Sequence, residues 1–131
     1  MSDSMDEENL LRQVHPAWIH EGQVSSQVFT PTKKDEGRLS VSRSSKTTPE
    51  AAFVHHTKKL GLASAGVVAV TTGECARIDV GWADDPVEGD MPDLAHAYLD
   101  MTSLSQGQIR TKAKLLKRLA QEKGFLYFSD E

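Results

Sequence analysis

An arginine, two serines and a helix start lie together in one short segment. Arg43, Ser44 and Ser45 come just before Thr48, where Thr-Pro-Glu is typical of a helix N-terminus. Free N–H groups at a helix start and a guanidinium can together bind a phosphate or carboxylate. We therefore predict an anion-binding site made of Arg43, Ser44, Ser45 and Thr48. The alternative is that the hydroxyls only cap and turn the chain while Arg43 pairs with a neighbouring acid.

Histidines are the side chains best suited to acid–base chemistry in this sequence. His15, His20 and His55 are the candidates for a general acid or base, since they could approach a ligand held by the anion site. His15 and His20 flank Trp18 in a cluster that can line a pocket or pack at the edge of a core. Their spacing of five residues across a proline does not suit two ligands on one helix face, so we expect no metal site and no cofactor.

Cys75 is the only cysteine, which excludes an internal disulfide and fits a reducing compartment. It follows a Thr-Thr-Gly-Glu turn, where a thiol could act as a nucleophile. A half-buried thiol with no chemical role is the more common outcome for a lone cysteine. The role of Cys75 therefore stays open at this point.

The net charge of −4 is unevenly distributed along the chain. Residues 105–124 contain six bases against one acid, whereas residues 76–101 contain seven acids against one base. We expect the basic segment to bind a protein partner through these four side chains: Arg110, Lys114, Lys117 and Arg118. The alternative is a solvated face that pairs with the chain's own acids. Nucleic acid fits less well, because the chain is acidic overall and no aromatic side chains alternate with the lysines.

Two helices and several strands must position these residues. Periodicity and end signals predict helices over residues 49–60 and 106–123, ended by Gly61 and Gly124. Alternating or continuous apolar residues predict strands at these places: 24–29, 38–42, 62–71, 96–100 and 125–128. Weaker patterns indicate a helical turn over 9–14 and a short strand over 77–80. The acidic residues 81–93 form the longest predicted loop.

This order of elements favours an α+β fold: a small mixed β-sheet with the two main helices packed on one face. A chain of 131 residues fits a single domain, which we place at residues 9–129. Residues 1–8 are acidic and lack apolar periodicity, so we expect a flexible tail.

The composition also limits the functions to be considered. No apolar run is long enough to span a bilayer, and the acidic start is neither a secretory signal nor a transit peptide, so we expect a cytoplasmic location. The sequence matches no phosphate-binding loop, nucleophile elbow or zinc finger. We expect a small binding or accessory protein that acts on a protein partner through its charged surfaces. The alternative is a small enzyme or ligand-binding domain for a phosphorylated or nucleotide substrate.

Overall fold

The structure, a computed structural model, describes residues 7–90 and 92–129. Its strands are β1 (Asn9–Val14), β2 (Ile19–His20), β3 (Gln23–Val24), β4 (Arg38–Arg43), β5 (Gly66–Thr71), β6 (Gly81–Asp84), β7 (His96–Asp100) and β8 (Tyr127–Phe128). Its α-helices are α1 (Pro49–Val54), α2 (Thr72–Arg77) and α3 (Gln106–Lys123). Short helical turns complete the chain: η2 (Pro16–Trp18), η3 (Ser26–Phe29), η4 (Lys33–Asp35) and η5 (His55–Lys59).

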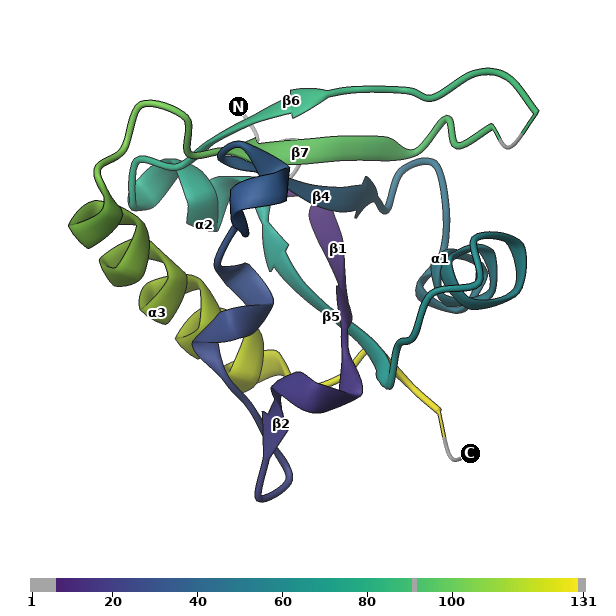
Figure 1. The fold of residues 1–131 in the computed structure, drawn as a ribbon, viewed down its shortest axis with the longest axis horizontal. Helices are drawn as coiled ribbons and strands as arrows, with labels where there is room; N and C mark the ends of the chain where they lie inside the picture. Colours follow the sequence, from purple (N-terminus) through teal and green to yellow (C-terminus); the bar gives the residue numbers. More distant parts are fainter. Residues whose placement is uncertain (1–6, 91, 130–131) are drawn as a thin grey trace.

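Six of the strands form one sheet in the order β6-β7-β4-β1-β5-β8 (Figure 1). Every pairing within it is antiparallel. Strands β2 and β3 form a separate hairpin. The predicted α+β class is therefore confirmed, while the sheet is antiparallel throughout and not mixed in direction.

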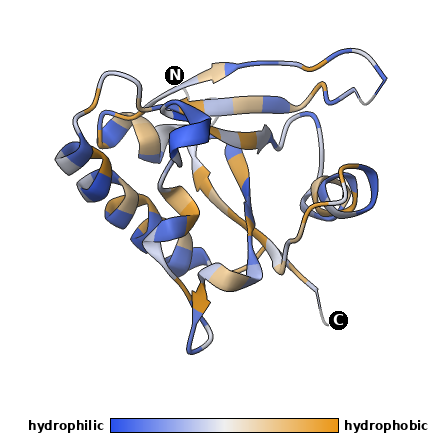
Figure 2. Cartoon of the chain, viewed as in Figure 1, coloured by the Kyte–Doolittle hydropathy of each residue, from blue (hydrophilic) through white to orange (hydrophobic). Residues whose placement is uncertain are grey.

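The two main helices lie on opposite sides of this sheet (Figure 1). On one side, Ile109, Ala113 and Leu116 of α3 join the large apolar cluster that fills the core. On the other side, Ala52 of α1 packs with a smaller cluster that includes Leu11. The expectation that both helices share one face is not confirmed. Figure 2 fits this arrangement of a sheet between two helices: hydrophobic segments lie in the strands between α1 and α3, and the turns along α3 are largely hydrophilic.

Both predicted helices form at the expected places. In α3 the Ser105 hydroxyl accepts a hydrogen bond from the Gln108 N–H, and the helix ends at Gly124, whose φ of 78° suits glycine. In α1 the Thr48 hydroxyl accepts from the Ala51 N–H, with a proline at the first helical turn. The chain then continues as the π-helical turn η5 before it reaches Gly61, so α1 itself is shorter than the predicted helix.

Three local predictions are wrong. Residues 9–14 form the interior strand β1 and not a helical turn, because long-range pairing with β4 and β5 stabilises the extended form. The segment expected as a strand near residue 77 is the end of α2, which starts with a Thr71 and Glu74 capping box, and the strand begins later as β6. Residues 24–29 form a strand only at their start and then the turn η3.

The predicted tail and the predicted acidic loop are described only in part, and the first residues of that loop form strand β6. Residues 1–6 fall outside the described residues, and the remainder of the predicted tail includes Glu8, which is held by ion pairing. The loop after β6 contains an isolated bridge between Val87 and Asp93. Among the described residues, no helix has the length and apolar character needed to cross a membrane.

Candidate functional site

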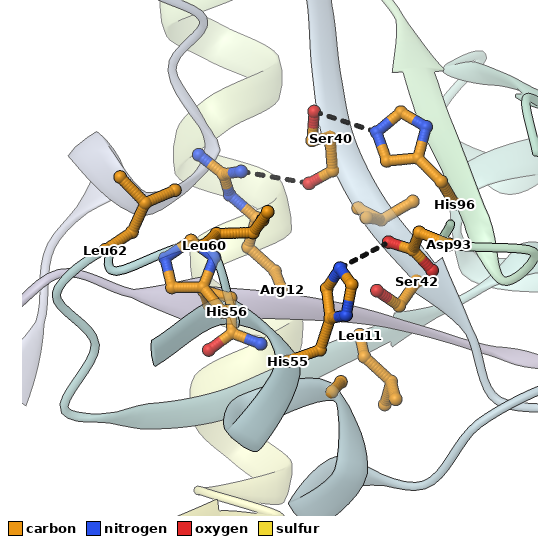
Figure 3. Close-up of a pocket in the computed structure, with 13 residues that line it drawn as sticks. Leu11, Arg12, Ser40, Ser42, His55, His56, Leu60, Leu62, Asp93 and His96 are labelled. Carbon is orange, nitrogen blue, oxygen red and sulfur yellow. Dashed lines mark hydrogen bonds and ion pairs between the residues drawn. The ribbon is translucent and has the colours of Figure 1, made fainter. Parts of the chain in front are cut away.

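A pocket of about 190 Å³ opens on the sheet face that carries α1, between that helix and strands β4 and β7 (Figure 3). Its walls are partly apolar, with Leu11, Leu60 and Leu62 among them. Its polar lining residues come from several separate segments: Arg12, Gln13, Ser40, Ser42, His55, His56, Asp93 and His96. A pocket with an apolar wall and a few convergent polar groups is the usual form of a ligand site.

The pocket exists because β1 and β4 separate. The two strands pair at only two positions, Leu10 with Arg43 and Leu11 with Ser42, whereas β1 follows β5 along its whole length. Beyond Leu11 the side chain of Arg12 bridges the gap. Its Nε donates to the Val28 carbonyl at 2.7 Å and its Nη1 donates to the Ser40 carbonyl at 2.9 Å.

Arg12 is a largely enclosed cation without an acidic partner. Its guanidinium lies 5.5 Å from the centre of the Trp18 ring. Among the described residues, no carboxylate lies within ion-pair distance of it. Burial lowers the pKa of Arg12 to about 10, partly opposed by the charge of Asp35. Arg12 therefore still carries its positive charge at neutral pH, and Asp35 acts on that charge only from beyond ion-pair distance.

Two histidines reach the pocket from the turn η5. His55 Nε2 lies 3.9 Å from Asp93 Oδ2, so the only acid in the pocket wall is next to an imidazole. Burial lowers the pKa of His56, and the nearby charge of Arg12 acts in the same direction, against a hydrogen bond with the Ala63 backbone. The neutral form of His56 is therefore favoured at neutral pH, and its ring can donate or accept a hydrogen bond.

A third histidine lies on the opposite wall. The Ser40 hydroxyl is 3.2 Å from His96 Nε2. His96 Nδ1 is 3.0 Å from the Asp85 carbonyl oxygen and 3.3 Å from Asp85 Oδ2. These contacts link a hydroxyl, an imidazole and a carboxylate at the mouth of the pocket.

The predicted anion site at Arg43 holds a carboxylate of the chain itself. Glu8 Oε1 is 2.9 Å from Arg43 Nη2, and Glu8 Oε2 accepts from the Ser45 N–H at 2.9 Å. Asp84 contacts Arg43 as well, at 3.3 Å. Burial opposes the charge of Glu8, but the hydrogen bonds from Arg43 and Ser45 outweigh it and lower the pKa of Glu8. The segment therefore supplies hydrogen-bond donors suited to an anion, and in this structure the Glu8 carboxylate occupies them.

The hydroxyls of Ser44 and Thr48, next to the Glu8 carboxylate and Arg43, bond to nearby backbone groups. Ser44 Oγ accepts from the Asn9 N–H at 3.1 Å, and Thr48 Oγ1 caps α1 by accepting from the Ala51 N–H. These contacts match the alternative in which the hydroxyls cap and turn the chain. Whether Arg43, Ser44, Ser45 and Thr48 bind an external anion stays a prediction.

The candidate acid–base histidines separate into two places. His55 lines the pocket, whereas His15 and His20 do not. His15 accepts from the Ala17 N–H at 3.0 Å, and His20 Nε2 is 3.3 Å from Gln27 Oε1. Among the described residues, no group of three or more His, Cys, Asp and Glu side chains is placed to hold a metal ion.

Cys75 does not suit nucleophilic chemistry. It is fully buried in the core cluster under β5. Burial raises the pKa of its thiol to about 12, and the charge of Glu74 acts in the same direction. A thiol with this pKa is protonated at neutral pH, so Cys75 is a packing residue.

The predicted partner-binding cations share an outward face of α3. Within the described chain, Arg110, Lys114, Lys117 and Arg118 form no ion pair. The acids of residues 76–101 contact other groups instead: Asp84 is near Arg43 and Lys46, and Asp85 is near His96 within the same segment. The alternative, in which the basic face pairs with the chain's own acids, is therefore not seen for these four cations among the described residues.

Sequence reasoning missed Arg12, Ser40, Asp85 and His96 as members of one site. A signal was present in the alternation of β4 and β7, where Ser40 and His96 both occupy the polar positions of half-buried strands. Only the pairing of these two strands brings the polar positions together, and a single sequence does not give that pairing. Comparisons of the chain with protein-family models, with curated proteins and with solved structures find no match.

Proposed function

We propose that this chain is a ligand-binding domain that holds a small organic anion, a carboxylate or a phosphate, in the pocket beside Arg12. The observation that carries the proposal is the environment of Arg12. Its guanidinium contacts two backbone carbonyls and the Trp18 ring but no carboxylate among the described residues. An enclosed charge without a counterion is costly, and an anionic ligand would relieve that cost.

The size and the lining of the pocket narrow the ligand class. A volume of about 190 Å³ is below the roughly 300–1,000 Å³ typical of pockets for drug-sized ligands. A short carboxylate or a phosphate group suits this volume better than a whole nucleotide. His55 and His56 can donate hydrogen bonds to the anion, and Leu60 and Leu62 can pack against a short apolar chain. We place this function in the cytoplasm, where a lone cysteine stays reduced.

The test is an amide and imidazole chemical-shift titration with inorganic phosphate and with butyrate. Saturable shifts centred on Arg12, His55 and His56 are expected. An Arg12→Gln change should weaken binding about tenfold or more, because a charge-assisted hydrogen bond is lost. The matched control is Arg38→Gln, since Arg38 is an exposed arginine on β4 whose guanidinium lies over Tyr98 instead of in the pocket.

A second variant covers the case in which Arg12→Gln does not fold. Leu62 is an exposed residue of the pocket wall, so Leu62→Glu adds a repelling carboxylate without disturbing the core. It should weaken binding, whereas Leu126→Glu, on an exposed side chain elsewhere, should not. Shifts centred on Arg43 and Ser45 would instead show that the anion binds where the Glu8 carboxylate lies in this structure. Absence of saturable shifts with both ligands would contradict the proposal.

A protein partner for the basic face of α3 is the second candidate function. It is favoured by one observation, that Arg110, Lys114, Lys117 and Arg118 have no ion-pair partner among the described residues. Unpaired cations on one helix face create a positive field that attracts an acidic surface. An acidic protein is the occupant that we propose, and nucleic acid is the competing one.

A further inference from the structure

Ser40, His96 and Asp85 form a continuous hydrogen-bonded chain at the mouth of the pocket (Figure 3 shows the first two). The order of chemical groups is hydroxyl, imidazole and carboxylate. In this order an imidazole can take the proton of the hydroxyl, while the third group fixes the ring and stabilises its charged form. Such a chain is recognised by geometry and not by sequence spacing.

The sheet register brings the three residues together. Ser42 lies opposite His96 and Ser40 lies opposite Tyr98 in the antiparallel pairing of β4 with β7. Ser40 and His96 are therefore diagonal neighbours on the same face of the sheet, close enough for their side chains to touch. Asp85 is fixed next to them because its N–H donates to the His96 carbonyl at 2.9 Å, where β6 runs beside β7.

The contacts of His96 favour one of its two neutral tautomers. Nδ1 has two acceptors within reach, the carbonyl and the carboxylate of Asp85, so the proton lies on Nδ1. Nε2 then presents its lone pair to the Ser40 hydroxyl, which donates to it. Ser40 is itself exposed, so a bound molecule can reach its oxygen.

We infer that Ser40 is a nucleophile, with His96 as its general base and Asp85 as the residue that positions His96, in the hydrolysis of a carboxylic ester with a short acyl group. The inference rests on the proposed function, because the pocket that would hold the acyl group is the one proposed to bind a small organic anion. The carboxylate that this reaction releases belongs to that ligand class.

The steps of the reaction balance without any cofactor. Ser40 Oγ attacks the ester carbonyl carbon and its proton passes to His96 Nε2. The bond between the carbonyl carbon and the alcohol oxygen then breaks, and the proton on Nε2 leaves with the alcohol. Water attacks the resulting acyl-serine and gives a proton to Nε2. The bond from carbon to Ser40 Oγ breaks, Oγ recovers the proton, and the carboxylic acid is released and ionises in water.

Arg12 supplies positive charge next to the backbone of Ser40. Its Nη1 is bonded to the main-chain carbonyl of Ser40, the nucleophile itself. A cation bonded to the backbone of the nucleophile adds a favourable electrostatic interaction with the negative oxygen that develops during attack. The apolar side chains of Leu11, Ala52 and Leu62 line the same pocket and limit the acyl group to a short aliphatic chain.

Labelling with a fluorophosphonate tests the nucleophile directly. Ser40 Oγ should displace fluoride from phosphorus, and peptide mapping by mass spectrometry should place one adduct on Ser40. Ser42 is the internal control, because it lies on the same face of the sheet but forms no bond with a histidine among the described residues. The Ser40→Ala variant should lose the label. An adduct on Ser42 instead, or no adduct at all, would overturn the inference.

Hydrolysis of p-nitrophenyl butyrate tests the two supporting residues. His96→Gln should lower kcat by about 100-fold or more, the usual contribution of a general base. Asp85→Asn should lower kcat while KM stays unchanged, and Asp85→Glu, which keeps the carboxylate, should recover part of the loss. The matched control is His20→Gln, since His20 is exposed and outside the pocket. Equal rates for wild type and His96→Gln would refute the mechanism.

Binding of butyrate to the Ser40→Ala variant separates the two proposals. This variant should still bind butyrate, because Arg12 and the apolar wall remain, with an affinity lowered by at most about tenfold through the loss of one neutral hydroxyl. Binding without labelling or turnover would leave the anion-binding function and remove the catalytic role. Failure of butyrate to bind both the wild type and the Ser40→Ala variant would contradict the anion-binding function. It would also contradict the catalytic inference, which depends on that function.

Discussion

Arg12 and Arg43 lie on neighbouring strands, but their guanidinium groups have opposite electrostatic surroundings. Arg43 contacts Glu8 and Asp84 and lies 5.1 Å from the centre of the Trp82 ring, and its bonds with Glu8 raise its pKa. Arg12 contacts two backbone carbonyls and the Trp18 ring, and burial lowers its pKa. The first arginine is therefore neutralised within the fold, whereas the second has no carboxylate within ion-pair distance among the described residues, which is the basis of the proposed ligand site.

The Glu8 carboxylate should stabilise the fold in a pH-dependent way. The pKa of Glu8 is lower in the folded chain than its ordinary value of 4.5, so its stabilisation is complete above that value. As the pH falls through the lowered pKa, the folded chain takes up the proton and the stabilisation disappears. Glu8→Gln should therefore cost about 1 kcal/mol at pH 7 in urea unfolding, and less at pH 3, below the ordinary value.

Glu88→Gln is the control for this change, since Glu88 is an exposed glutamate of the acidic loop. It should leave the unfolding free energy unchanged at both pH values. A Glu8→Gln variant as stable as the wild type at pH 7 would mean that the ion pair with Arg43 contributes nothing net, as many exposed pairs do.

The elements show which parts of the site were readable from the sequence. Capping residues and periodicity predict α1 and α3, because a helix start such as Thr48 depends on neighbouring residues. Alternation predicts β4 and β7 for the same reason. Strand β1 was missed because its extended form depends on β5, more than 50 residues away along the chain. The pocket was missed with it, since Arg12 fills the gap where β1 leaves β4.

Helix α1 is the element whose stability should control the pocket. It is six residues long and leads directly into the turn η5, which carries His55 and His56. Loss of the N-terminal cap of α1 should therefore destabilise the helix and the turn together. Thr48→Ala should cost about 1 kcal/mol and speed amide exchange over residues 49–59. Butyrate binding should weaken as well.

Ser105→Ala is the matched control for this cap, because Ser105 caps α3 with the same kind of bond to the N–H three residues on. It should cost a similar free energy, measured by urea unfolding, while the imidazole shifts of His55 and His56 stay unchanged. Equal effects of the two variants on the pocket histidines would show that α1 does not hold the site.

At the scale of the whole molecule, the sheet is covered on both sides because β5 is apolar on both sides. Val68 and Val70 point into the cluster under α3, whereas Val67 and Ala69 join the cluster under α1. A strand that is buried on both faces needs a covering layer on each face. The continuous apolar run of β5 is therefore evidence in the sequence against two helices on the same face. The consequence for function is a division of surfaces: the α1 side carries the pocket, and the α3 side carries the unpaired cations.

The α3 surface should bind an acidic partner through charge. The double variant Lys114→Glu and Lys117→Glu reverses two cations that have no ion-pair partner among the described residues. The new acid at position 114 lies four residues from both Arg110 and Arg118, so it can pair with them and support the helix. A fluorescent glutamate-rich peptide should bind the wild type more weakly as salt rises, and should bind the variant at least about tenfold more weakly.

The matched control is Lys33→Glu with Lys34→Glu, two exposed lysines on another surface, which should leave peptide binding unchanged. Anisotropy measured in parallel with short RNA and DNA separates the two kinds of partner. A steeper salt dependence and tighter binding for the oligonucleotides would identify nucleic acid as the occupant, because phosphate contacts release counterions. Equal peptide binding by the wild type and the α3 variant would contradict the α3 surface as an interface, since the reversed charges lie at its centre.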